Sequence, residues 1–180
     1  MYKGIEPIIL IALRQGEEFE CSMKGILAVG ELNAIFSASN SYYKEITENH
    51  YQLNIESNGQ MDEYELLLRG TNIIIEKLNI IKENILQQEY NTVITENNSV
   101  QIEITNEDYT CGGPLNYVLQ NMKEVIFSGV SKPNFMEKNI MITCAIDKKY
   151  NPLEIITKAI DTTIEYYKNI RKKIEILSNK

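Results

Sequence analysis

The stretch NEDYTCGGPLNYVL, residues Asn106–Leu119, decides the fold, because it joins a predicted strand to a predicted helix. Before it, Ser99–Thr105 alternates apolar and polar residues, a pattern typical of a strand with one buried face. After it, the apolar spacing predicts an amphipathic helix. Thr110 can cap this helix with Pro114 in its first turn, or Gly113 is the cap and Pro114 the first helical residue. The sequence leaves both starts open.

The composition is that of a globular chain. It has 180 residues, 43% hydrophobic and 24% charged, which suits one domain or two tightly joined halves with a sizeable core. A formal net charge of -7 repels phosphate backbones and argues against direct nucleic-acid binding. No apolar run approaches the roughly 20 residues that span a membrane. Heavy use of isoleucine, asparagine and lysine favours an AT-rich genome as the source.

Cysteine usage argues against a metal site and against disulfides. Cys21, Cys111 and Cys144 are an odd number at wide spacing, and His50 is the sole histidine. Without a C-x-x-C pair, reduced thiols in a cytosolic compartment fit best and zinc does not. Cys111 with His50 is the one thiol–imidazole combination, and no third group supports it.

Two further motifs near residue 110 admit a chemical interpretation. Gly112-Gly113 lies between a predicted strand and a predicted helix, but it lacks the Lys-Ser/Thr of a phosphate-binding loop. Glu107-Asp108 supplies two carboxylates, but neighbouring residues on a turn point in different directions, so turn capping is favoured over metal binding. We therefore expect no catalytic residues, no metal and no cofactor.

The first half is predicted to contain three strands and one long helix. Ile8–Leu13 and Phe19–Met23 read as a β-hairpin, and Tyr51–Glu56 as a further strand. A helix is predicted over Asp62–Gln88, beginning at Asp62 or Glu63. Its apolar stripe consists of Leu66, Leu67, Gly70, Ile73, Ile74, Leu78, Ile81 and Ile85.

Gly70 has two interpretations. It is a tolerated helix glycine that costs about 1 kcal/mol relative to Ala, or it allows close approach of a partner helix. The family resemblance given below favours the second interpretation.

The second half continues with short strands and a second long helix. Strands are predicted at Thr92–Thr95, Val125–Ser128 and Asn139–Ile146. Cys144 and Ala145 interrupt the alternation of the last strand, which predicts burial on both faces. A helix then runs over Pro152–Ser178, with proline in its first turn. Its stripe consists of Ile155, Ile156, Ala159, Ile160, Ile164, Tyr167, Ile170, Ile174 and Leu177.

A basic run lies on the solvent side of this second helix. It consists of Lys168, Arg171, Lys172 and Lys173. Its position near the helix C-terminus favours the negative end of the helix dipole and adds solubility. The alternative is a phosphate-binding patch, which the negative net charge disfavours.

Several motifs of the second half keep the order and spacing of one family. Glu107-Asp108, an aromatic residue, Thr110, a small-residue turn containing Gly112, and Leu115 are similar to E-D-H-T-L-G-N-x-L. The run VIFSG, with Phe127 and Gly129, is similar to V-x-F-A-G-Y, and YNPLE, with Pro152, to Y-S-P-x-E. Over roughly residues 92–175 the chain thus resembles the L-type subunit of cellular RNA polymerases. Tyr109 replaces the usual His, and Cys111-Gly112-Gly113 the usual Leu-Gly-Asn.

Motifs of the first half resemble the D-type subunit of the same polymerases. Gly16–Phe19 is similar to G-Q-E-L, and Lys24–Ile26 to K-G-x. Glu56-Ser57-x-Gly59, followed by Gly70 and Leu78, is similar to the D-type strand and helix pattern F-x-V-E-S-x-G. A full D-type subunit begins with a strand and helix that this chain lacks. We expect a reduced half with an exposed apolar patch, or a fragment, or completion by another chain.

The resemblance implies an α+β fold of two RNA polymerase D/L-like halves, residues 1–90 and 91–180. Each half would hold a sheet and a long helix, and the two would pack as an intramolecular pseudo-dimer. The implied function is a non-catalytic polymerase assembly subunit that binds the second-largest subunit and a small zinc-bearing subunit. Fused subunits of this kind are characteristic of large DNA viruses, which implies the host cytoplasm or virion, or the nucleus. The expected signature and interface residues are Glu56, Ser57, Gly59, Gly70, Leu78, Glu107, Asp108, Thr110, Gly112, Leu115, Phe127, Gly129, Pro152 and Ile160.

Two rival functions come from other classes. A small-molecule-binding α+β protein would enclose a ligand between strands and helices and would be a stable monomer. A homodimeric interaction module would have no association with transcription. Neither explains why the D-like motifs precede the L-like motifs in this order.

Overall fold

The computed structural model describes residues 9–178, and its contacts divide the chain into two compact units, Met1–Leu66 and Leu67–Lys180. The first unit contains a 3-10 turn, η1 (Ala34–Phe36), and an antiparallel pair of strands, β1 (Ser39–Thr47) and β2 (His50–Ser57). No helix among the described residues is long and apolar enough to cross a membrane.

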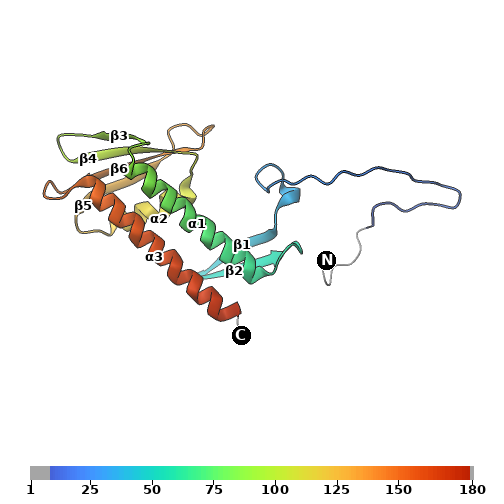
Figure 1. Ribbon diagram of the computed structural model, residues 1–180. Helices are drawn as coiled ribbons and strands as arrows, with labels where there is room; N and C mark the ends of the chain where they lie inside the picture. The colour runs from blue at the N-terminus through green and yellow to red at the C-terminus, as the bar shows by residue number, and fades with distance from the viewer. Residues whose placement is uncertain (1–8, 179–180) are drawn as a thin grey trace. The chain divides into compact units, whose positions relative to one another are not determined.

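The second unit is a four-stranded antiparallel sheet with helices against one face (Figure 1). The sheet order is β3-β4-β6-β5, so β6, the last strand in sequence, lies between β4 and β5. The elements in chain order are α1 (Glu63–Leu86, which begins in the first unit), β3 (Asn91–Ile94), β4 (Ser99–Thr105), α2 (Tyr109–Gln120), β5 (Val125–Ser131), β6 (Asn139–Ile146) and α3 (Pro152–Ser178).

The sheet buries a single face. Along β6 every second residue is buried, and β4 shows the same alternation. The predicted burial of β6 on both faces is therefore wrong. Cys144 behaves as a small apolar core residue, so the alternation continues through it, and Ala145 lies on the opposite, half-buried face.

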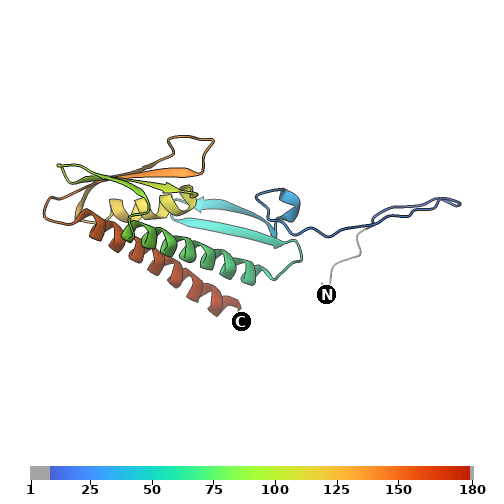
Figure 2. The same cartoon turned by 45° about the horizontal axis from the view of Figure 1, so that its top comes forward.

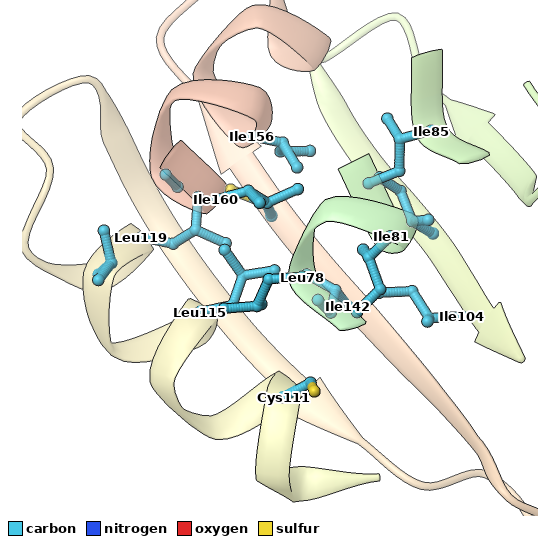
Figure 3. Packing of buried hydrophobic residues seen from close by; sticks show 14 of the residues in the cluster. Leu78, Ile81, Ile85, Ile104, Cys111, Leu115, Leu119, Ile142, Ile156 and Ile160 are labelled. Atoms are coloured by element: carbon cyan, nitrogen blue, oxygen red, sulfur yellow. The ribbon is translucent and has the colours of Figure 1, made fainter. Parts of the chain in front are cut away.

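The core lies between this sheet face and all three helices (Figure 3). Its fully buried side chains come from α1, β4, α2, β6 and α3. The largest are Leu78, Ile81, Val100, Ile102, Ile104, Leu115, Leu119, Ile140, Ile142, Ile146, Ile156 and Ile160.

The observed bounds of the two long helices, α1 and α3, agree closely with the predicted ranges. Asp62 caps α1, because its Oδ2 accepts from the backbone N–H of Tyr64 at 3.1 Å. Both views show α1 and α3 side by side, running in opposite directions (Figures 1 and 2). Lys82 Nζ of α1 donates to both carboxylate oxygens of Asp161 of α3, at 2.7 and 2.8 Å.

The predicted stripes are correct in the core and wrong outside it. Ile73 of α1 is exposed, while Ile75 packs against the core. In α3 the buried residues end at Ile164, and Ile170 and Leu177 are exposed.

A strand–helix arrangement occurs twice in the chain. β1, β2 and α1 follow one another directly, as do β5, β6 and α3. Strands β2 and β6 each have eight residues, and each is joined to its helix by five residues, 58–62 and 147–151. The sequence analysis did not identify this repeat, because β1 was not predicted.

The predicted N-terminal hairpin is wrong. Residues 9–33 contain neither strand nor helix, while Ile8, which opens the predicted first strand, lies outside the described residues. A strand needs a neighbour for its backbone hydrogen bonds, and nothing in the described chain pairs with this segment. Conversely, β1 was missed, although Tyr42, Tyr43 and Ile46 favour a strand.

Neighbouring isoleucines of α1 test this architecture. Ile81 is 1% exposed and Ile80 is 54% exposed. Ile81→Ala should lower the free energy of unfolding by about 2–5 kcal/mol, because it leaves a cavity in the core. Ile80→Ala removes the same atoms from an exposed site and should change it by less than about 1 kcal/mol. Urea unfolding measures the free energy of unfolding of both variants. Equal losses for Ile81→Ala and Ile80→Ala would contradict the described orientation of α1.

Candidate interaction site: the turn before α2 and its surroundings

Asp108 caps α2, so both predicted helix starts are wrong. The backbone N–H of Thr110 donates to Asp108 Oδ1 at 2.8 Å. The Thr110 side chain, and secondly this backbone hydrogen bond, hold the pKa of Asp108 below its usual value. The helix begins at Tyr109, which places Pro114 in the second turn rather than the first. Its ring removes the backbone donor that would bind the Thr110 carbonyl. Asp108 lies two residues before Thr110, the cap that the sequence analysis considered. That analysis assigned Glu107-Asp108 to turn capping and did not consider Asp108 as the helix cap.

Glu107 connects the turn to α1. Lys77 Nζ donates to Glu107 Oε2 at 3.0 Å, and the Glu107 side chain is only 11% exposed. This hydrogen bond raises the pKa of Lys77. The adjacent carboxylates thus have separate structural uses, one as a cap and one as an ion pair. No group of three or more metal-ligating side chains occurs in the described part of the chain.

Cys111 lies buried in the first turn of α2. Burial, and secondly the nearby Glu107 carboxylate, raise the pKa of its thiol to about 12. The thiol is therefore protonated at neutral pH, and a protonated thiol is a poor nucleophile. Cys111 serves as a small core residue.

Gly112 allows α2 to lie directly on the sheet. A Cβ at this position would lie 2.7 Å from Cδ1 of Ile140 on β6 and 3.0 Å from Cγ2 of Val130 on β5. Around Gly113, by contrast, a Cβ would meet nothing within 4 Å. The first glycine is thus required for packing, and the sequence analysis missed this role because the neighbouring strands are distant in sequence.

Polar contacts also fasten α2 to β5. The buried Ser128 Oγ donates to Oδ1 of Asn116 at 2.7 Å, and Gln120 Nε2 donates to the Ser128 carbonyl at 3.0 Å. Neither α2 residue was singled out from sequence. On the other face of β5, the exposed Phe127 ring lies beside Gly129, where a Cβ would be 3.3 Å from the ring.

The remaining second-unit signature residues are structural. Leu115, Leu78 and Ile160 lie together in the core (Figure 3). Pro152 is the first residue of α3, as predicted, and Asn151 Oδ1 accepts from the backbone N–H of Leu153 at 3.0 Å to cap the helix.

One residue outside the predicted set holds the end of the sheet. Asn98 Nδ2 donates to the carbonyls of Ile146, Asp147 and Tyr150 at 3.3, 3.2 and 3.1 Å. Asn98 has a positive φ of 58°, which asparagine tolerates better than most residues.

In the first unit, the Glu56-Ser57-x-Gly59 motif forms the turn from β2 into α1. The backbone N–H of Ser57 donates to Glu63 Oε1 at 3.2 Å, and that of Gly59 donates to Ser57 Oγ at 3.1 Å. Gly59 has a positive φ of 86°, which explains the glycine, and Glu56 is exposed on β2.

Gly70 approaches nothing within the described residues. A Cβ there would meet no atom within 4 Å, so the close approach favoured from sequence is not made to any described part of this chain.

The basic run of α3 does not act on the helix dipole. The helix continues to Ser178, and its last turn contains no basic residue. Dipole effects fall off within one turn, so the dipole interpretation is wrong. Arg171 Nε instead donates to Glu175 Oε1 at 2.9 Å, and Lys168, Lys172 and Lys173 are exposed.

Comparison with known proteins finds a family match within the second unit. Residues 99–173, from β4 into α3, match the family described as the RNA polymerase Rpb3/Rpb11 dimerisation domain. This segment is similar to that family over less than half of the chain. The expected resemblance to polymerase dimerisation subunits is therefore confirmed, and the turn, Gly112 and the α2–β5 contacts all lie in the Rpb3/Rpb11-type segment.

Curated relatives extend the similarity to the rest of the chain. Over 172 residues, 94% of this chain, it is 25% identical to a putative DNA directed RNA polymerase subunit of Acanthamoeba polyphaga mimivirus, and covers 48% of that protein. Over 69 residues, 38% of this chain, it is 32% identical to the probable DNA-directed RNA polymerases I and III subunit RPAC2 of Caenorhabditis elegans, and equally to that of Caenorhabditis briggsae. The chain spans about half the length of the curated relatives it matches.

The two glycines of α2 provide a matched test. Gly112→Ala should lower the free energy of unfolding by about 1–2 kcal/mol, because overpacking against Ile140 and Val130 exceeds the gain in helix propensity. Gly113→Ala should raise it by up to about 1 kcal/mol, because its new methyl group meets open space. Urea unfolding distinguishes them, and a stabilising Gly112→Ala would contradict the close approach of α2.

The cap of α2 should make stability depend on pH. The folded pKa of Asp108 lies below its usual value of 3.8, so its stabilisation is present above that pH and is lost as the pH falls through the folded pKa. At pH 7, Asp108→Ala should cost about 1 kcal/mol, while Asp108→Asn retains a capping oxygen and should cost little. On acidification the wild type should lose stability relative to Asp108→Asn. If the wild type and Asp108→Asn differ by the same free energy of unfolding at pH 7 and at pH 3, this role of Asp108 is contradicted.

Proposed function

We propose that this chain is a non-catalytic assembly subunit of a DNA-directed RNA polymerase. The observation that carries the proposal is the Rpb3/Rpb11-type segment itself, whose signature turn connects α1, the sheet and α2 through Lys77–Glu107 and Gly112. The chain would serve as a platform, and RNA synthesis would belong to the complex.

The two-half organisation is part of this proposal. We take residues 1–90 as a reduced D-type half and 91–180 as an L-type half that pack as a pseudo-dimer. The repeated order of two strands and a long helix, with five-residue connections before α1 and α3, supports such a duplication. So does the pairing of α1 with α3 through Lys82 and Asp161. Joining both halves in one chain would make their association independent of concentration.

Exposed apolar residues of α1 supply a surface for other subunits. Ile73 and Ile80 are exposed and seven residues apart, so they lie on one outer face, two turns from each other. Gly70 lies one turn before Ile73 and allows a partner helix to approach closely. We assign the partners as the second-largest polymerase subunit and a small zinc-bearing subunit, in the host cytoplasm, the virion or the nucleus.

The ligand-binding rival is less well supported. It needs a cavity enclosed between strands and helices, but the space between the helices and the central strands β4 and β6 is filled by side chains such as Leu115, Ile142 and Ile156, all 1% exposed or less.

Affinity isolation from the native source tests the proposal. The full chain, carrying a C-terminal tag, should recover two very large polymerase subunits in equal amounts by quantitative mass spectrometry. The isolated complex should synthesise RNA on a DNA template. An identically tagged Ile81→Asp chain, whose core is broken, controls for non-specific capture and should recover neither subunit. A monodisperse monomer or homodimer without such partners would overturn the proposal.

A further inference from the structure

The N-terminal arm, residues 9–29, exposes many apolar side chains although it has no regular secondary structure. Both views show it doubling back on itself (Figures 1 and 2). Its exposed large apolar residues are Ile9, Leu10, Ile11, Leu13, Phe19, Met23, Ile26, Leu27 and Val29. None of them belongs to the core. So much unburied apolar surface in one segment is characteristic of a binding element.

The turn of a hairpin is already formed at the tip of the arm. The backbone N–H of Glu17 donates to the Arg14 carbonyl at 3.1 Å, and that of Arg14 donates to Glu17 Oε2 at 2.9 Å. Gly16 has a positive φ of 87°, which a tight turn of this kind requires. The two sides of the arm nevertheless make no strand ladder, as the strand assignment of the described residues shows.

The two sides of the arm have different sequence patterns. Ile9–Leu13 is apolar at every position, which is typical of a strand with neighbours on both edges and cover on both faces. In Glu18–Met23, apolar Phe19, Cys21 and Met23 alternate with polar residues. This pattern is typical of an outer strand with one solvent-exposed face. The charged residues of that face, Glu18 and Glu20, suit a sheet edge, because charges on edges oppose further pairing.

We infer that the arm folds into a β-hairpin by adding to the exposed sheet edge of a separate polypeptide. Ile9–Leu13 becomes the inner strand, hydrogen-bonded to the partner's edge strand on one side. Glu18–Met23 becomes the new outer strand on the other side. Main-chain hydrogen bonds supply the affinity, and the partner provides an apolar surface for Phe19 and Met23.

The four-stranded sheet of a second copy is a poor acceptor for the arm. Of its outer strands, β3 has only four residues. The other, β5, has a register irregularity between Val125 and Phe127. Short or irregular edge strands resist the addition of another strand. The inference rests on the proposed function, since the partner is a subunit of the assembled polymerase.

Hydrogen exchange of the full chain, alone and within the isolated polymerase complex, tests the inference. In the complex, consecutive amides of residues 9–13 should be protected, because an inner strand is bonded on both sides. In residues 18–23 protection should alternate, because an outer strand is bonded on one side only. In the chain alone, both segments should exchange freely.

A competition between variants supplies a second readout. Ile11→Pro removes a ladder donor from the inner strand, while Leu27→Pro makes the same change beyond the hairpin. Each variant and the wild type, with different tags, are expressed together in the native host. Ile11→Pro should be incorporated into the complex at most about one tenth as often as the wild type, and Leu27→Pro about equally. Both should unfold like the wild type, because the arm contributes nothing to the core.

Each outcome decides between the inference and the proposed function. A polymerase complex in which residues 9–23 exchange freely, or which incorporates Ile11→Pro normally, overturns the inference and leaves the proposed function intact. Concentration-dependent protection in the chain alone shows pairing between copies and also overturns it. Failure of the wild-type chain to recover polymerase subunits overturns both.

Discussion

Helix α2 can lie against β5 and β6 only because residue 112 has no side chain. This close approach places Asn116 within hydrogen-bonding distance of the buried Ser128, and it brings the turn before α2 under α1, where Glu107 meets Lys77. Three helices and a sheet thus converge on one short segment. The signature residues of the Rpb3/Rpb11-type segment therefore serve packing, which agrees with the proposed assembly function.

Elements with one buried face could be predicted from the sequence with high accuracy. Strands β4 and β6 have the predicted bounds, because alternating burial produces a period of two that turns delimit sharply. Helices α1 and α3 differ from prediction by at most a few residues. Their stripes failed only where the helix leaves the core, at Ile73, Ile170 and Leu177, since periodicity shows that a face is apolar but not what covers it.

Features that depend on distant residues could not be predicted. The need for Gly112 arises from Ile140, and the ion pair of Glu107 from Lys77, thirty residues away. The start of α2 was ambiguous because several capping residues are adjacent, and only the backbone geometry shows that Asp108 is used. The arm had strand-like patterns, but a strand also needs a neighbour, and the pattern does not show whether that neighbour belongs to the same chain.

The position of β6 has a consequence for synthesis on the ribosome. It is the last strand to emerge, yet it lies between β4 and β5, so those two strands have no shared neighbour until about residue 146 has been made. During that interval their apolar faces are also without α3. The nascent chain therefore carries open sheet edges from the end of β4 at Thr105 until β6 is complete at Ile146. Efficient production favours rapid elongation or chaperone protection through this stretch.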